Sequence, residues 1–291
     1  MVRALAIVAL GFLVGSRSHA VVAKIVTLNL YNRPASRGAR LANAAAALRA
    51  TAPDIIVLQE VGSGLLAGTS ALDRLQAEFP QEAGWRWASH WQETNLGLWR
   101  NGLAIASRFP LENSAYTELP QSTAWDLKGF QRAAVRVGHA TLDLVNVHLR
   151  STRSETVKEA ELDTLAGSVA GGPEGTHWRV VAGDFNWEWE HPLTRAFRHR
   201  LGAASALGGL LSPEITATWT PESDGPCDER VPGEPHQLID DILVVALRGS
   251  ARVLDPGIQV GRRLPRASDH CAVFASVELV APPIALTRQV R

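Results

Sequence analysis

The alternation of short apolar runs with amphipathic stretches, which continues from residue 24 to residue 279, constrains the fold of this chain most strongly. The apolar runs have the length and the β-branched content of buried strands, and two of them are joined by a tight turn at Gly138 and His139. The predicted strands are residues 24–30, 54–58, 103–107, 133–137, 141–149, 179–182, 239–245 and 271–279. Such a pattern is typical of an α/β domain.

Two of the amphipathic stretches have the spacing of helices. Ser36 can cap the first helix and Pro53 ends it, and the second helix covers residues 155–169. Their apolar faces comprise Leu41, Ala45 and Leu48 in the first helix and Leu162, Leu165 and Val169 in the second. No repeat and no linker rich in Pro or Gly divides the chain, so residues 21–280 are predicted to form one domain, followed by a tail at 281–291.

The first twenty residues have the layout of a secretory signal peptide. Arg3 supplies a positive start, residues 4–15 form an apolar core, and residues 18–20 form a small-x-small exit. The apolar run is short for a membrane span. A buried core helix is the alternative interpretation of this segment. We therefore expect a mature protein that begins near Val21, is secreted or periplasmic, and has no stable membrane span.

Composition and charge exclude several classes of protein. Hydrophobic residues make up 46% of the 291 residues, which argues against disorder, and no further long apolar run indicates a multi-span membrane protein. The chain has 29 Lys and Arg residues and 29 Asp and Glu residues. Bulk charge alone therefore cannot hold a nucleic acid, whereas a local basic patch still can.

Eight polar residues lie within the predicted strands or at their carboxyl ends. Buried carboxylates and amides cost desolvation energy unless they are paired or bound to a metal, and strand ends gather at one rim of an α/β sheet, where ligands bind. Any single one has a structural explanation as a cap, a turn or a satisfied core group. Together they predict a ligand site, and they are Asn29, Glu60, His148, Asp184, Asn186, Asp240, Asp269 and His270.

Seven short motifs occur in a fixed order: Leu28-Asn29, Leu58-Gln59-Glu60, residues 102–110, Asn146-Val147-His148-Leu149, Gly183-Asp184-Phe185-Asn186, Ile239-Asp240 and Ser268-Asp269-His270. In this order they resemble the endonuclease/exonuclease/phosphatase superfamily, which includes pancreatic-type deoxyribonucleases, apurinic endonucleases, neutral sphingomyelinases and inositol-polyphosphate 5-phosphatases. The resemblance covers about residues 23–280. It implies a four-layer α/β sandwich, in which two mixed β-sheets pack face to face with helices outside.

The resemblance also implies a metal site and a base. Glu60 would bind a divalent metal, and Asn29 and Asp269 would complete the shell directly or through water. Such an all-oxygen set suits Mg²⁺ or Mn²⁺. His270 would be the general base that takes a proton from the attacking water, oriented by Asp240.

Three further roles follow from the resemblance. Asp184 and Asn186 would position the nucleophile and contact the phosphorus-bound oxygens, and His148 would donate to a non-bridging or leaving oxygen. The family often has a tyrosine where this chain has Asp241. Either Asp240 or Asp241 could therefore orient the base, and we favour Asp240.

Arg132 and Trp187 are candidate substrate contacts, each with a structural alternative. Arg132 matches a recurrent arginine of the family, and a structural ion pair would explain it equally well. Trp187 and Trp189 follow Asn186 directly and would either form an aromatic wall that stacks a base or touches lipid, or simply pack in the domain.

Cys227 and Cys271 are the only cysteines. Export permits a disulfide between them, which would tie residues 223–235 to the rim beside His270. A buried free thiol at Cys271 is the other interpretation, because that residue precedes the core of the last predicted strand.

These observations predict an exported, Mg²⁺-dependent phosphoesterase that hydrolyses a phosphodiester. An endonuclease-like enzyme that acts on DNA or RNA is the first choice, because of the size of the chain and because no inserted membrane hairpin is evident. A phospholipid phosphodiesterase of the sphingomyelinase kind is the alternative, and a catalytically silent binding module on the same fold is a third. We expect a monomer.

Overall fold

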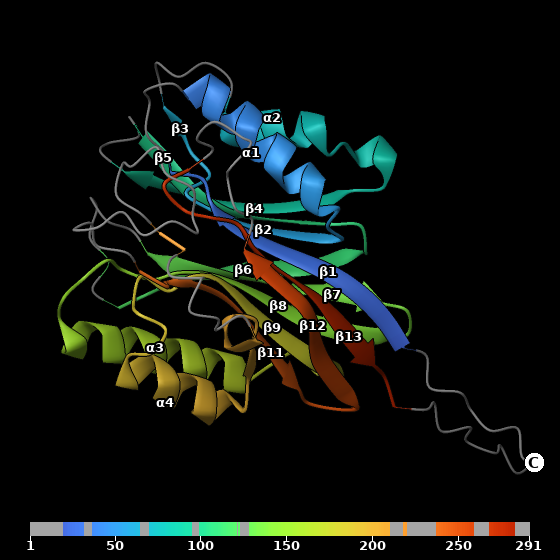
Figure 1. The fold of residues 1–291 in the computed structure, drawn as a ribbon, viewed down its shortest axis with the longest axis vertical. Coiled ribbons are helices and arrows are strands. Elements are labelled where there is room, and N and C mark those ends of the chain that lie inside the picture. The colour runs from blue at the N-terminus through green and yellow to red at the C-terminus, as the bar shows by residue number, and fades with distance from the viewer. Residues whose placement is uncertain are drawn as a thin grey trace, which may run out of the picture.

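The structure, a computed structural model, describes residues 20–31, 37–64, 70–94, 99–120, 122, 128–209, 218–219, 237–258 and 268–282. These residues form four layers (Figure 1). Two β-sheets pack face to face, with helices α1 and α2 outside one sheet and α3 and α4 outside the other. The predicted four-layer α/β sandwich is confirmed. Most of the predicted signal segment, most of the tail and residues 223–235 lie outside the described residues.

The first sheet has seven described strands in the order β12-β13-β1-β2-β5-β3, with β4 also paired to β5. They are β1 (Ala20–Asn29), β2 (Ile55–Gln59), β3 (Ser63–Gly64), β4 (Arg86–Thr94), β5 (Trp99–Ser107), β12 (Ser250–Ile258) and β13 (Val273–Val280). The central strand β1 is parallel to β2 and antiparallel to β13, so the first and last strands of the domain are neighbours.

The second sheet has six described strands in the order β10-β11-β9-β8-β7-β6. They are β6 (Leu111–Glu118), β7 (Gly129–Val137), β8 (Ala140–His148), β9 (Thr176–Asp184), β10 (Ala204–Ser205) and β11 (Asp240–Ala246). Strands β7 and β8 form the predicted hairpin. Gly138, in its turn, has φ +63°, a left-handed conformation that glycine adopts without strain.

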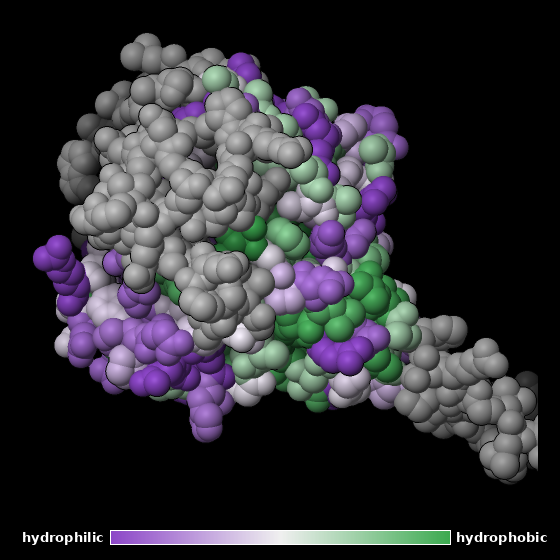
Figure 2. All heavy atoms as spheres, in the orientation of Figure 1, coloured by the Kyte–Doolittle hydropathy of each residue, from purple (hydrophilic) through white to green (hydrophobic). Residues whose placement is uncertain are grey.

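The helices are α1 (Arg37–Thr51), α2 (Ala71–Glu78), α3 (Glu155–Ala170) and α4 (Pro192–Leu201), with 3₁₀ turns at Gln81–Ala83 and Leu207–Gly209. The predicted apolar faces of α1 and α3 are both buried against the sheets. Figure 2 shows hydrophobic side chains gathered over β12 and β13 on one face, and hydrophilic ones over α3 and α4. Among the described helices, none is long and apolar enough to cross a bilayer.

Strand direction brings the polar residues to one rim of the sandwich. The parallel pairs β1–β2 and β8–β9 all end at this rim. Strands β11 and β13 run antiparallel to β9 and β1, so it is their starts that reach the rim. The expectation that every candidate residue lies within a strand or at its carboxyl end is therefore wrong for Asp269 and His270, which precede β13, and Asp240 opens β11.

Candidate functional site

Asp184, at the end of β9, is the centre of the polar cluster. Its Oδ2 atom accepts hydrogen bonds from Asn29 Nδ2 at 2.9 Å and from Asn186 Nδ2 at 3.0 Å. The same oxygen lies 3.6 Å from His148 Nε2 and 3.8 Å from His270 Nε2. Four other predicted residues, from elements of both sheets, thus surround the carboxylate of Asp184.

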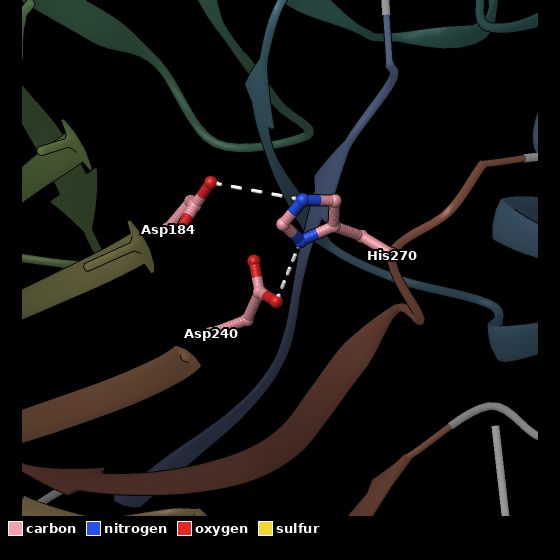
Figure 3. A group of neighbouring side chains, drawn as sticks. All are labelled: Asp184, Asp240 and His270. Atoms are coloured by element: carbon pink, nitrogen blue, oxygen red, sulfur yellow. Dashed lines mark hydrogen bonds and ion pairs between the residues drawn. The ribbon is translucent and has the colours of Figure 1, made fainter. Parts of the chain in front are cut away.

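The imidazole of His270 lies between two carboxylates (Figure 3). Its Nδ1 is 2.8 Å from Asp240 Oδ2, and its Nε2 faces Asp184. Because successive residues of a strand point to opposite faces, Asp241 points away from the ring and accepts hydrogen bonds from Ser205 Oγ and from backbone N–H groups. Of the two aspartates, Asp240 is therefore the one that contacts His270.

The charges around the imidazole of His270 determine the pKa values of His270 and Asp184. Burial alone would lower the pKa of His270, but the nearby carboxylates of Asp240 and Asp184 raise it to about 10. Burial and the charge of Asp240 raise the pKa of Asp184, and His270 and Lys128 lower it, with the result that it lies at about 6. The site carries more negative than positive charge, which is the condition that a bound cation relieves.

Glu60 and Asp269 form the more open side of the cluster, and the buried Asn29 lies beside Glu60. Asn29 Nδ2 donates to Glu60 Oε1 at 3.3 Å, and the hydroxyl of Ser268 donates to the Asn29 carbonyl at 2.6 Å. The side chains of Glu60 and Asp269 are 25% and 15% exposed. Burial raises the pKa of Asp269, and the carboxylate of Glu60 contributes to this rise, so the two charges lie close together.

These oxygen donors fit a hard divalent cation such as Mg²⁺ or Mn²⁺. Asp184, Asp240 and His270 also present ligand atoms within 4.8 Å of one another. In that second group the His270 Nδ1 atom already pairs with Asp240, and all three residues are buried. The second group is thus buried and already paired within itself, whereas the carboxylates of Glu60 and Asp269 are partly exposed and can be reached by a cation.

Three non-glycine residues just beyond the strand ends have positive φ angles. They are Tyr31 (+49°), Glu60 (+51°) and Asn186 (+48°), which follow β1, β2 and β9. Left-handed backbone is costly for such residues and persists where surrounding contacts enforce it, most often at functional sites. At Asn186, the backbone N–H donates to Asp184 Oδ1 at 2.8 Å and the side chain donates to the Leu149 carbonyl at 2.9 Å.

His148 contacts a lysine that the sequence did not single out. Lys128 Nζ lies 2.7 Å from His148 Nε2. Burial lowers the pKa of His148 well below its usual value, and the charge of Lys128 lowers it further, so the ring is neutral. The neutral imidazole accepts a hydrogen bond from Lys128 at Nε2. The positive charge of this pair therefore lies on the ammonium group of Lys128 and not on His148.

Two other residues support the rim without having been predicted. Trp219 Nε1 donates to Asp269 Oδ2 at 3.2 Å. The hydroxyl of Thr218 accepts from the backbone N–H of Asp240 at 3.0 Å and so holds the start of β11. The adjacent pair Thr218-Trp219 interrupts a segment with little other secondary-structure signal, and Lys128 is one of only three lysines. These two sequence features are the ones from which Thr218, Trp219 and Lys128 could have been predicted as site residues.

The structure does not bring Arg132 to the rim. Its guanidinium makes two 2.6 Å contacts with Asp143 and donates to the Ser168 carbonyl. Asp143 is buried, also pairs with Arg179, and lies five residues before His148 on β8. This is the ion-pair alternative, and it corrects the assignment of Arg132 as a substrate contact.

Trp187 and Trp189 take packing positions. The ring of Trp187 packs edge-on against His191, with centroids 4.9 Å apart. Trp189 Nε1 donates to Ser205 Oγ at 2.9 Å, and the Arg198 guanidinium lies 4.0 Å from its ring centroid. Both rings line a small cavity behind Asp240, which is the packing alternative for these residues.

The structure is similar to several solved structures at low sequence identity. TDP2 from D. rerio, in complex with a single-strand DNA product, has a TM-score of 0.68 at 16% identity and covers 88% of this chain and 98% of that one. Sphingomyelinase C from Streptomyces griseocarneus has a TM-score of 0.64 at 17% identity, with 88% and 99% covered. An endonuclease/exonuclease/phosphatase from Beutenbergia cavernae has a TM-score of 0.68 at 18% identity, with 90% and 72% covered.

These likenesses establish the fold. No curated protein gives a significant sequence match. The sequence model of the Endonuclease/Exonuclease/phosphatase family matches residues 26–270, which include every motif of the rim. The chain therefore belongs to the endonuclease/exonuclease/phosphatase family, whose enzymes are phosphoesterases that depend on divalent metal ions.

Proposed function

We propose that the protein is an exported, Mg²⁺- or Mn²⁺-dependent phosphodiesterase that acts on nucleic acid. The observation that carries this proposal is the imidazole of His270 between Asp240 and Asp184, on the same rim as an oxygen-donor set. This geometry is that of a general base with its orienting carboxylate. It supports hydrolysis by an activated water, with no covalent intermediate on the protein.

Each side chain then has a definable task. His270 Nε2 accepts a proton from the attacking water, while Asp240 at Nδ1 stabilises the imidazolium that forms. Asp184 accepts a hydrogen bond from the attacking water. Both amide hydrogens of Asn186 go to Asp184 and to the Leu149 carbonyl, so Asn186 positions this carboxylate, which replaces the phosphate contact first given to it. The positive charge toward the phosphate comes from Lys128, which the neutral His148 holds in place. This replaces the donor role first given to His148.

Glu60, Asn29 and Asp269 are the residues that would hold the cation. When bound, it would neutralise phosphate oxygens and stabilise the charge that develops in the transition state. A cation on these oxygens would also offset the carboxylate charge around His270, so that the ring could be neutral before it takes a proton.

Nucleic acid is the preferred substrate class, in line with the similarity to the DNA-bound TDP2 structure. The similarity to sphingomyelinase C supports the alternative, a phospholipid phosphodiesterase. Both are phosphodiesters, and the residues described above suit either. A binding module without activity would retain the fold but hydrolyse neither.

Export is supported by the N-terminal sequence and by a disulfide. Cys271 is disulfide-bonded. The sequence contains one other cysteine, Cys227, which lies outside the described residues. Disulfides persist in oxidising compartments, which suits a secreted or periplasmic protein.

The test is hydrolysis by the mature protein, residues 21–291, after its metals have been stripped with EDTA. Plasmid DNA, RNA, sphingomyelin and a generic phosphodiester are compared with and without Mg²⁺ or Mn²⁺. We expect no hydrolysis without metal and recovery with either ion, on nucleic acid above lipid. The variant Glu60→Gln should lose this recovery, whereas Glu112→Gln, on the exposed strand β6, should keep it. Full hydrolysis in metal-free buffer would contradict the proposal.

A further inference from the structure

Three buried polar atoms lack a hydrogen-bond partner among the described residues and belong to one neighbourhood. They are Asp240 Oδ1, Thr194 Oγ1 and Trp187 Nε1. Asp240 and Thr194 are 1% and 5% exposed. The other oxygen of Asp240 pairs with His270, so the unpartnered atom belongs to the carboxylate that orients the base.

All three residues line the same cavity. It lies between the start of β11, the loop after Asn186 and the first turn of α4, and its volume is about 10 Å³. That is close to the least volume that accommodates one water molecule. The rest of the lining is mostly apolar and includes Phe185 and Leu243.

We infer that this cavity is a binding site for one internal water, which bridges Asp240, Thr194 and Trp187 behind the catalytic dyad. The hydrogen-bonding capacities match a water molecule. The indole Nε1–H can only donate, the carboxylate oxygen can only accept, and the hydroxyl can do either. One water that accepts from Trp187 and donates to Asp240 and Thr194 makes three bonds, the usual number for a buried water.

Energetics favour the water over the bare atoms. A buried carboxylate oxygen without a partner costs more than the ordering of one water, whose entropy cost is small when it makes several bonds. The protein groups nearby are already engaged. Trp189 donates to Ser205, and Arg198 donates to the Trp189 carbonyl at 2.7 Å. The single indole donor of Trp189 is therefore already used, and Arg198 makes no hydrogen bond to Asp240 Oδ1, which has no partner among the described residues.

The water gives Trp187 and Thr194 a role as positioning residues. With both carboxylate oxygens bonded, the plane of Asp240 is fixed and its Oδ2 stays directed at His270 Nδ1. Outer-shell partners of this kind commonly change activity by about tenfold or more when removed. This catalytic consequence rests on the proposed function, whereas the water site itself does not.

A crystal structure of the mature protein at high resolution tests the site directly. We expect a water within about 3.2 Å of all three atoms. Direct contact of Thr194 or Trp187 with Asp240 Oδ1, or a cavity without water density, would overturn the inference. This result is independent of whether the protein hydrolyses any phosphodiester.

Kinetics of Thr194 variants test the positioning role. Thr194→Val keeps the shape but removes the hydroxyl, and should lower kcat about tenfold with KM unchanged. Thr194→Ser should retain kcat, because it keeps the hydroxyl. Thr164→Val, which removes a hydroxyl that bonds within α3, is the matched control and should behave as wild type. Wild-type kcat in Thr194→Val would overturn the role.

Discussion

His270 makes the most direct link between a single residue and the proposed chemistry, because both of its ring nitrogens face carboxylates. Replacement by Ala should lower kcat by roughly 10²–10⁴-fold, the usual range for loss of a general base. The control is His139→Ala in the exposed β7–β8 turn, at the far end of the hairpin from the rim. Near-wild-type kcat in His270→Ala would mean that another group takes the proton.

Individual side chains also show how far the sequence alone could reach. The eight residues of the predicted rim lie together, because the ends of some strands and the starts of others converge there. Lys128 could not be predicted in this way, because a lysine beside a strand is common on any protein surface. The partners of Arg132 could not be predicted either, because Asp143 and Ser168 lie in other elements and only the folded structure shows how these elements pack.

At the scale of secondary-structure elements, the elements with one clear apolar face were predictable. Helices α1 and α3 and the β7–β8 hairpin follow the predicted ranges closely. Strands β6 and β12 lie at sheet edges. Strand β6 was missed because most of its residues are exposed, and β12 because its residues are mostly only partly buried and include a Pro and a Gly near its end. Strand β4 was missed for a related reason, since among the described strands β5 is its one partner.

The two sheets are held in register beneath the rim by one buried amide. Asn146 Nδ2 donates to the carbonyls of Leu58 at 2.9 Å and Ala104 at 3.1 Å in the opposite sheet, and its Oδ1 accepts from Gln59 Nε2 at 2.8 Å. Asn146→Ala should cost about 2–4 kcal/mol, because three buried groups lose their partner. Urea unfolding measures this. A loss no larger than that of Gln81→Ala, an exposed amide, would contradict the role.

Helix α3 carries a buried lysine with a testable pH signature. Burial lowers the pKa of Lys158 to about 8, against the opposing effect of Glu161, and its Nζ donates to the carbonyls of Arg150 and Phe185. The folded pKa lies below the unfolded value of 10.5, so between pH 8 and 10.5 the unfolded chain binds more protons. The contribution of Lys158 to the free energy of unfolding should therefore rise with pH across this window.

Denaturant unfolding at several pH values from about 8 to about 10, within this window, checks this sign. We expect a gain of about 1–3 kcal/mol that is missing in Lys158→Met, which cannot titrate. The free energy of unfolding of the wild type is therefore compared with that of Lys158→Met at each pH. An equal slope in both proteins would show that Lys158 does not titrate there.

At the scale of the whole molecule, export and the disulfide make one joint prediction. Native protein should begin near Val21 and contain no free thiol, which N-terminal sequencing and alkylation without reductant measure together. Cys227 and Cys271 are 44 positions apart, so reduction should lower the free energy of unfolding by about 4 kcal/mol on chain-entropy grounds. An intact Met1 with two alkylated thiols would contradict both expectations.

The pairing of β1 with β13 also governs when this protein can fold. Residues 20–27 pair one by one with residues 280–273, although they are separated by almost the whole chain. The central strand of the first sheet therefore lacks one neighbour until the ribosome has completed the last strand, and contacts this distant form slowly. We expect the nascent chain to stay open throughout synthesis, a state in which it can still be threaded across a membrane.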